Sequence, residues 1–207
     1  MMKPENFDTN VFINCALDEA YRPLLWSMVF SIIACGYQPC LALQERDAGV
    51  IRLEKIKRLI NSSRLGIHDI SRTAPDIKSG LPRFNMPFEL GLDLGAREYG
   101  KAHLANKKIL ILDKERYRYQ QFLSDIAGQD IASHEDDPIQ IIESVRSWLN
   151  ALRTPGPPLV GPVRIIQLYR SFQAELPEIC GVAALNVTYL DLNDFLYFSA
   201  QWIELRA

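Results

Sequence analysis

The stretch "LPRFNMPFELGLDLGAREYGKAHLANKKILILD", residues 81–113, joins a helical pattern to an apolar strand. Pro87 and Glu89 open the helix, which we expect over about 87–100, and "KKILILD" is the strand that follows. Gly91 and Gly95 lie one helical turn apart, although each costs up to about 1 kcal/mol relative to alanine. The stretch therefore predicts a close approach at the glycines, and it leaves one early carboxylate, Glu89, without an obvious structural task.

Strands and helices alternate on both sides of this stretch. Buried strands are expected at 10–16, 37–43 and 65–71, a short fifth strand at 130–136, and helices at 19–36, 51–64, 117–127 and 138–153. Strands that alternate with helices indicate an α/β fold with a parallel sheet covered by helices on both faces. The basic residues of the 51–64 segment, Lys55, Lys57, Arg58 and Arg64, are expected on a solvated helix face.

The last fifty residues have a different composition. Residues 154–162, "TPGPPLVGP", hold four prolines and two glycines, which predicts a linker. Beyond it, Phe195, Phe198, Trp202 and Leu205 recur at helical spacing. We therefore expect an α/β domain over 1–153, a linker over 154–162 and a helical C-terminal extension over 163–207. That extension would dock on the sheet domain or on another subunit.

Composition excludes several classes of protein. The 207 residues carry a net charge of −2, which gives no electrostatic footprint for nucleic acid or for a membrane surface. The apolar run at 23–35 is too short to span a bilayer, and the polar start is not a secretory signal. The four cysteines have no zinc-ligand spacing. The sequence predicts a cytoplasmic protein without a metal site.

Polar side chains gather where the predicted strands end. Ligands of parallel α/β sheets bind at the carboxyl ends of the strands, so these side chains are candidate site residues. No glycine-rich dinucleotide loop, phosphate-binding lysine loop or serine nucleophile elbow accompanies them. The candidate set is Asn14, Asp18, Asp69, Ser71, Asn85, Glu89 and Gly91.

Glu89 is the candidate catalytic residue of this set. We expect it in the first turn of its helix, where the helix dipole favours an ionised carboxylate. Such a carboxylate can bind ribose hydroxyls, or attack or stabilise the anomeric carbon as a base departs. Gly91 would let the helix approach a strand or let a sugar come near. Asp93 either joins this site or pairs with Arg97 along the helix.

The segments "GIHDIS", "LPRFNMPFELGLDLGA" and "KKILILD" resemble the core of the nucleoside 2-deoxyribosyltransferase-like and TIR-like superfamily. Asp69 and Ser71 match its strand end, Asn85 matches its loop asparagine, and Glu89-Leu90-Gly91 match its Glu-Leu-Gly helix. The opening "VFINCALDEAY" is similar to the first strand of bacterial TIR-like proteins. The resemblance covers roughly residues 10–113. It departs from the pattern at the long loop 72–84 and at about half a dozen inserted residues before the strand at 107–113.

The resemblance implies a flavodoxin-like three-layer sheet and an enzyme that breaks or transfers an N-glycosidic bond. Glu89 would be catalytic, and Asn14, Asp18, Asp69, Ser71, Asn85 and Gly91 would bind substrate. NAD is the leading substrate, and a nucleoside or nucleoside monophosphate is the second. The resemblance also implies a homo-oligomer and an antiphage role. No cofactor is expected beyond NAD as substrate.

Structural roles compete with each of these assignments. Taken alone, Glu89 is better explained as a glutamate that offsets the helix dipole, and Asp69 is equally well explained as a cap for the loop after its strand. Ser71 and Asn85 fit turns, His68 fits the core, and Cys15 fits a buried structural thiol. The rival function is a non-catalytic module that binds a nucleotide or signals by self-association.

Overall fold

The computed structural model describes residues 3–73, 75, 80–153 and 155–206. The chain divides into two compact units, and each is described by itself. The sheet unit comprises Met1–Tyr21 and Gln38–Asp136, and the helical unit comprises Arg22–Tyr37 and Asp137–Ala207. Several residues of the loop 72–84 (74 and 76–79) lie outside the described residues, as does residue 154 of the expected linker.

The sheet unit is built on five parallel strands in the order β2-β1-β3-β4-β5. This order is flavodoxin-like, so the predicted α/β fold class is confirmed. Strand β3 is buried at every position, as a central parallel strand must be. The strands are β1 (Asn10–Asn14), β2 (Gln38–Cys40), β3 (Leu65–Asp69), β4 (Lys108–Asp113) and β5 (Ile131–Ser133).

Register brings the ends of the strands to one edge. Asn14 pairs with His68, Asp69 with Leu112, and Asp113 with Ser133. The polar residues that end β1, β3 and β4 therefore share the carboxyl edge of the sheet. Ligands bind at this edge in such folds, so the structure places these residues at the edge where the sequence predicts a site, and binding there stays a prediction.

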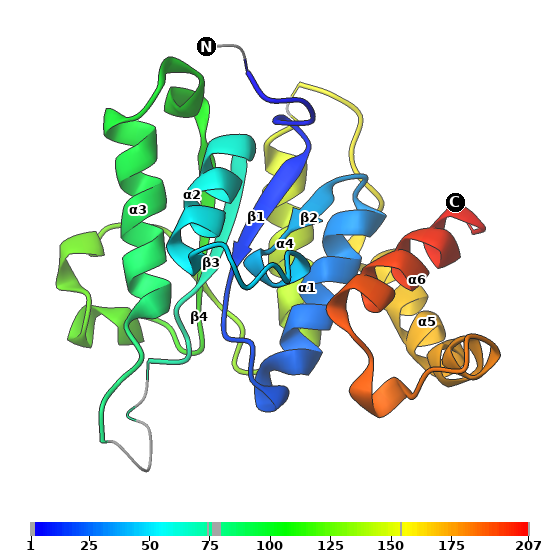
Figure 1. The fold of residues 1–207 in the computed structure, drawn as a ribbon. Coiled ribbons are helices and arrows are strands. Elements are labelled where there is room, and N and C mark those ends of the chain that lie inside the picture. Colours follow the sequence, from blue (N-terminus) through cyan, green and yellow to red (C-terminus); the bar gives the residue numbers. More distant parts are fainter. Residues whose placement is uncertain (1–2, 74, 76–79, 154, 207) are drawn as a thin grey trace. The chain divides into compact units, whose positions relative to one another are not determined.

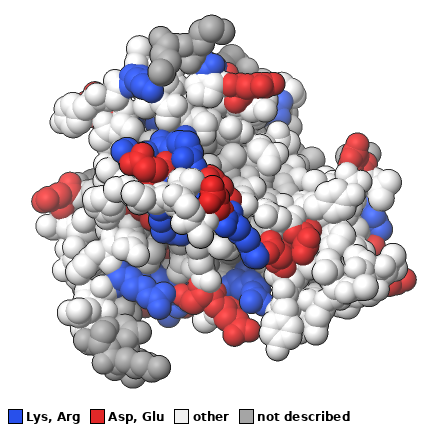
Figure 2. Space-filling view, viewed as in Figure 1, with Lys and Arg blue, Asp and Glu red and all other residues white. Residues whose placement is uncertain are grey.

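Two helices cover one face of this sheet, α2 (Arg52–Ser62) and α3 (Asn85–Tyr99). They lie side by side in Figure 1, and both contact β1. Ile56 and Ile60 of α2 pack on Phe12 of β1 and on Leu92 and Ala96 of α3. Charged side chains of both signs are interleaved over α2 in Figure 2. Lys57 pairs with Glu54 and Arg58 with Glu45.

Short turns complete the sheet unit. They are η1 (Glu19–Tyr21), η2 (Ala42–Gln44), η3 (Ala102–Asn106), η4 (Arg118–Gln121) and η5 (Ser124–Ile126). The helix expected at 117–127 is therefore wrong, since two 3-10 turns replace it. Tyr117 adopts a left-handed conformation with φ 62°, which stops any helix from starting there. Tyr119 is still buried, so the apolar residues that suggested a helix are also buried by 3-10 turns.

The described residues of the helical unit form four long helices. They are α1 (Arg22–Ala34), α4 (Pro138–Ala151), α5 (Pro162–Val182) and α6 (Leu192–Glu204), with the turn η6 (Val187–Tyr189) before α6. Phe30 of α1 lies 5.3 Å, between ring centroids, from both Tyr169 and Phe172 of α5. Trp202 of α6 joins this aromatic cluster. The unit therefore has its own core, made from residues far apart in sequence.

Each unit is made of two separate segments of the chain, whereas the sequence predicted the consecutive segments 1–153, 154–162 and 163–207. That division stays a prediction. Residues 155–161 are irregular, and α5 begins at Pro162. Among the residues that the structure describes, no helix has the length and apolar character needed to cross a membrane.

Candidate functional site

Glu89 lies in the second turn of α3, because the helix begins at Asn85 and not at Pro87. The expectation of a first-turn glutamate stabilised by the helix dipole is therefore wrong. Pro87 occupies the third helical position, where its missing N–H is still tolerated. The Glu89 side chain is only 7% exposed. Burial raises the pKa of this carboxyl, and Arg52 counteracts part of that effect.

Two cavities meet at Glu89. The outer one is a groove of about 210 Å³ between α2 and α3, lined by Arg52, Leu53, Ile56, Asn85, Phe88 and Glu89. The inner one is a cavity of about 10 Å³, which has room for roughly one water molecule. It is lined by the end of β1, by residues 41–43 and again by Arg52 and Glu89. Glu89 is thus reached from the helical groove and not through the strand-end cavity.

Arg52 is the cation that faces Glu89, and the sequence reasoning missed it. Its Nη2 lies 3.8 Å from Glu89 Oε1, while the Arg52 side chain itself is 56% exposed. Lys55, expected on the solvated face, is instead buried and donates to the carbonyls of Glu45 and Asp47 at 2.9 and 2.6 Å. The helical pattern placed α2 correctly but could not show which of its cations faces α3.

Asn14 lies beside Glu89, as expected, and lines the inner cavity. Its amide Nδ2 donates to the Met86 carbonyl and to His68 Nδ1, both at 2.9 Å. Because Met86 belongs to the first turn of α3, Asn14 fixes the start of the Glu89 helix to the end of β1. Asn85 is exposed in the outer groove, so the structure brings Asn14, Asn85 and Glu89 together around the two cavities.

Asp69 and Ser71 belong to a separate buried cluster. Asp69 accepts from the Tyr21 hydroxyl and from the Ser71 backbone N–H, and His134 Nε2 lies 3.1 Å from its Oδ2. Neither Asp69 nor Ser71 lines the two cavities at Glu89. The Ser71 hydroxyl is buried and has no hydrogen-bond partner in the described part of the chain. Tyr21 and His134 carry no sequence signal, since both lie far from Asp69 along the chain.

Asp18 and Gly91 line neither of the two cavities at Glu89. Asp18 accepts from the Tyr21 backbone N–H at 3.1 Å and lies 3.5 Å from Arg83 Nη1. Gly91 is exposed on α3, and a Cβ there would meet nothing within 4 Å among the described residues; the same holds for Gly95. The expected close packing of a strand at these two glycines is therefore wrong, whereas the approach of a sugar at Gly91 stays a prediction.

The glycine that does permit a close approach is Gly66 in β3. A Cβ at this position would lie 2.5 Å from Asp93 Oδ2 and 3.2 Å from His68 Nε2. Asp93 is fully buried, and it accepts from His68 Nε2 at 3.0 Å and pairs with Lys107 Nζ at 3.1 Å. Its expected partner, Arg97, is thus replaced by two buried ones. His68 is a core residue, as predicted.

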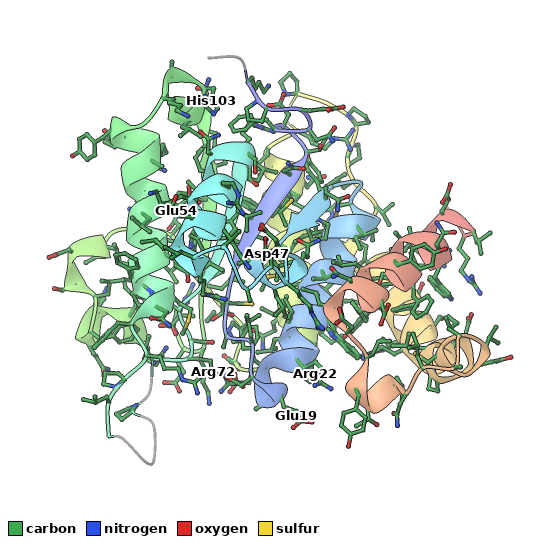
Figure 3. The ribbon with its side chains drawn as sticks, viewed as in Figure 1. Glu19, Arg22, Asp47, Glu54, Arg72 and His103 are labelled. Carbon is green, nitrogen blue, oxygen red and sulfur yellow. The ribbon has the colours of Figure 1, made fainter. Side chains whose placement is uncertain are left out.

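A larger cavity, of about 470 Å³, lies at the amino edge of the sheet and is lined by Lys3, Phe7, Asp8, Arg64, His103, Asn106 and Lys108. Figure 3 marks the two edges, with His103 at the amino end and Arg72 in the loop after β3. Asp8 pairs with both Lys3 and Arg64, so with Lys108 this lining keeps an excess of positive charge and its one acid is already paired. We assign the candidate site to Glu89 because its carboxyl is nearly buried, borders a groove and has a raised pKa.

The described residues contain no group of three or more histidine, cysteine or acidic side chains arranged to hold a metal ion. The fold defines the class: a flavodoxin-like α/β protein, here with a nearly buried carboxylate, Glu89, beside a groove between α2 and α3. No protein-family profile, curated protein or solved structure matches the chain.

Proposed function

We propose that the protein breaks or transfers the N-glycosidic bond of a nucleotide, with NAD as the leading substrate and Glu89 as the catalytic carboxylate. The observation that supports this most is the placement of Glu89. Its carboxyl is nearly buried, its pKa is raised, and it forms the wall of a groove large enough for a sugar. Perturbed carboxyls that border a cavity are concentrated at functional sites.

The rest of the groove suits a nucleoside. Phe88 is 55% exposed and offers a ring face on which a base can stack, while Asn85 offers an amide for sugar hydroxyls. The groove of about 210 Å³ is smaller than the roughly 300–1,000 Å³ of pockets that hold drug-sized ligands. It therefore takes one nucleoside unit, and the second half of a dinucleotide would lie outside it.

The chemistry follows from a carboxylate held against a ribose. As the bond from the anomeric carbon to the base breaks, its electron pair leaves with the base, and positive charge grows on the ring. An ionised Glu89 stabilises that charge, because the desolvated carboxylate interacts with it more strongly than a hydrated one would. Water, or a second nucleoside, then supplies the oxygen or nitrogen that bonds to the anomeric carbon and releases a proton.

Incubation of the pure protein with NAD, followed by chromatography of released nicotinamide, tests the proposal. Glu89→Gln keeps the shape of the side chain and removes its charge, so release is expected to fall at least about 100-fold, in the range seen when transition-state stabilisation is removed. Glu98→Gln is the matched control, because Glu98 is exposed on the same helix. Release that survives in Glu89→Gln contradicts the assignment of Glu89.

A second candidate, a nucleotide-binding module without turnover, is favoured by the inner cavity. With room for about one water molecule, that cavity does not admit a ribose to the strand ends. Binding of NAD without release of any base, by wild-type protein at all concentrations that allow assembly, would support the module. A cytoplasmic location, self-association and an antiphage role belong to the same proposal, and size-exclusion chromatography with and without NAD tests the assembly.

A further inference from the structure

The inner cavity and the outer groove share two lining residues, Arg52 and Glu89. These two side chains therefore form the wall between a cavity with room for one water and a groove of about 210 Å³. The Glu89 side chain is held in the interior at 7% exposure, whereas Arg52 is mostly exposed. Of the two, Arg52 is the part of the wall that is free to move.

The contact between them is weak. The 3.8 Å separation of Arg52 Nη2 and Glu89 Oε1 exceeds hydrogen-bond length. In the described part of the chain this is the ion pair found for Arg52, and half-exposed pairs of this kind contribute about 0–1 kcal/mol. A ligand that offers the guanidinium a shorter, bidentate partner would draw it away from Glu89.

Phosphate is the partner that fits the surroundings of Arg52. Arg52 is the first residue of α2, and Asn85 is the first residue of α3, so two helix N-termini border the groove. Among the described residues, no side chain caps either N-terminus. Figure 3 marks Asp47 before the start of α2 and Glu54 in its first turn. Glu54 is paired with Lys57, and Asp47 accepts from the Gly49 N–H. Uncapped N–H groups together with an exposed, weakly paired arginine favour a phosphate over a neutral group.

We infer that Arg52 separates the inner cavity from the outer groove in the free protein and joins them by binding a phosphate of the substrate. Binding the phosphate would move the guanidinium off Glu89 and extend the groove at this carboxylate towards Asn14. The site therefore prefers nucleotides, and a free nucleoside, which can enter only the outer groove, leaves the inner cavity closed. This inference rests on the proposed function for its consequence in turnover, but its binding step stands apart from any reaction.

Binding of AMP and adenosine, measured by titration calorimetry, tests the inference without any turnover. Wild-type protein is expected to bind AMP at least about tenfold more tightly than adenosine, which corresponds to about 1.4 kcal/mol. Arg52→Ala is expected to bring that ratio close to one, and Arg52→Lys to restore part of it. Arg58→Ala is the control, because Arg58 lies exposed on the same helix and pairs with Glu45.

A preference for AMP that persists in Arg52→Ala overturns the inference, and so does the absence of AMP binding to wild-type protein at millimolar concentration. The AMP preference together with no release of base from any nucleotide leaves the inference intact and removes the proposed function. Where NAD is turned over, Arg52→Ala is expected to raise KM and to shift the acid limb of the kcat/KM profile to higher pH. That shift follows because Arg52 lowers the pKa of Glu89, and a purely structural role would not move this limb.

Discussion

The close approach at Gly66 gives the sharpest prediction about the fold. An alanine methyl group there would lie 2.5 Å from Asp93 Oδ2, well inside van der Waals contact. Asp93 cannot swing away, because it is fully buried and held by His68 and Lys107. Overpacking of this kind costs about 1–3 kcal/mol, and the reduced entropy of the unfolded chain returns about 0.4–1 kcal/mol. We expect Gly66→Ala to lower the free energy of unfolding by about 1–2 kcal/mol.

A double-mutant cycle shows whether the clash with Asp93 is the cause. Asp93→Ala alone leaves the buried Lys107 without its carboxylate and is expected to cost about 3 kcal/mol. In the Gly66→Ala background the same change also relieves the clash, so it should cost about 1–2 kcal/mol less. Gly91→Ala is the control, since its Cβ meets nothing within 4 Å and the change should stabilise α3 by up to about 1 kcal/mol.

The assay must separate the two units. The three tryptophans, Trp26, Trp148 and Trp202, all lie in the helical unit, so their fluorescence reports that unit alone. Hydrogen exchange of β3 amides under increasing urea reports the sheet unit. A Gly66→Ala protein whose β3 exchange is unchanged to within about 0.5 kcal/mol has no clash at this position, and effects of Gly66→Ala and Asp93→Ala that add without coupling show that Asp93 is not its cause.

Three further results are expected. Because burial raises the pKa of Glu89, the folded protein loses stability as pH rises through that pKa. Glu89→Gln should therefore raise the free energy of unfolding at pH 7, but not at a pH below the pKa of free glutamate. Urea titrations at the two pH values check this. Burial and the nearby carboxylates raise the pKa of the Cys15 thiol, so Cys15 should react with a thiol reagent far more slowly in the folded protein than after denaturation, and rapid labelling would contradict its buried, protonated state. Phe172→Ala removes the ring at the centre of the aromatic cluster and should cost the helical unit about 3–5 kcal/mol, seen as an earlier tryptophan fluorescence transition in urea.

The sheet could be predicted because its signals are local. Each strand is a short apolar run bounded by polar or turn residues, and each helix carries its own periodicity, so the element order follows from windows of about ten residues. The boundary of α3 could not be placed in this way. At the start of α3, Asn14 of β1 donates to the Met86 carbonyl, a contact between residues 72 positions apart that no short window of sequence contains.

Short windows of sequence also could not show which glycine lies against a neighbouring element. Gly91 and Gly95 stood out because glycine is unfavourable inside a helix, but the structure leaves open space beside both. Gly66 does not stand out in the sequence, since the reason for a glycine in an apolar strand becomes clear only when the side chain packed against it is known. Its need for glycine comes from Asp93, which only the packing of α3 on β3 brings within reach.

Glu89 and Asp93 lie one turn apart on α3, and their difference supports the choice of Glu89 as the functional acid. Asp93 has two buried partners, and despite the desolvation these partners lower its pKa. It borders neither of the cavities at Glu89. Among the described residues, the charged partner of Glu89 is Arg52, which lies 3.8 Å away and has a mostly exposed side chain. The pKa of Glu89 is raised.

A protein that needed only stability would either pair Glu89 as well as it pairs Asp93 or replace it with an apolar residue, because a poorly compensated buried carboxyl is destabilising. Retention of such a group beside an open groove is the pattern of a site that gives up stability for function. The energetic cost of burying Glu89 can be measured. If Glu89→Gln does not stabilise the protein at neutral pH, burial imposes no penalty on the carboxylate, and the contrast with Asp93 no longer points to function.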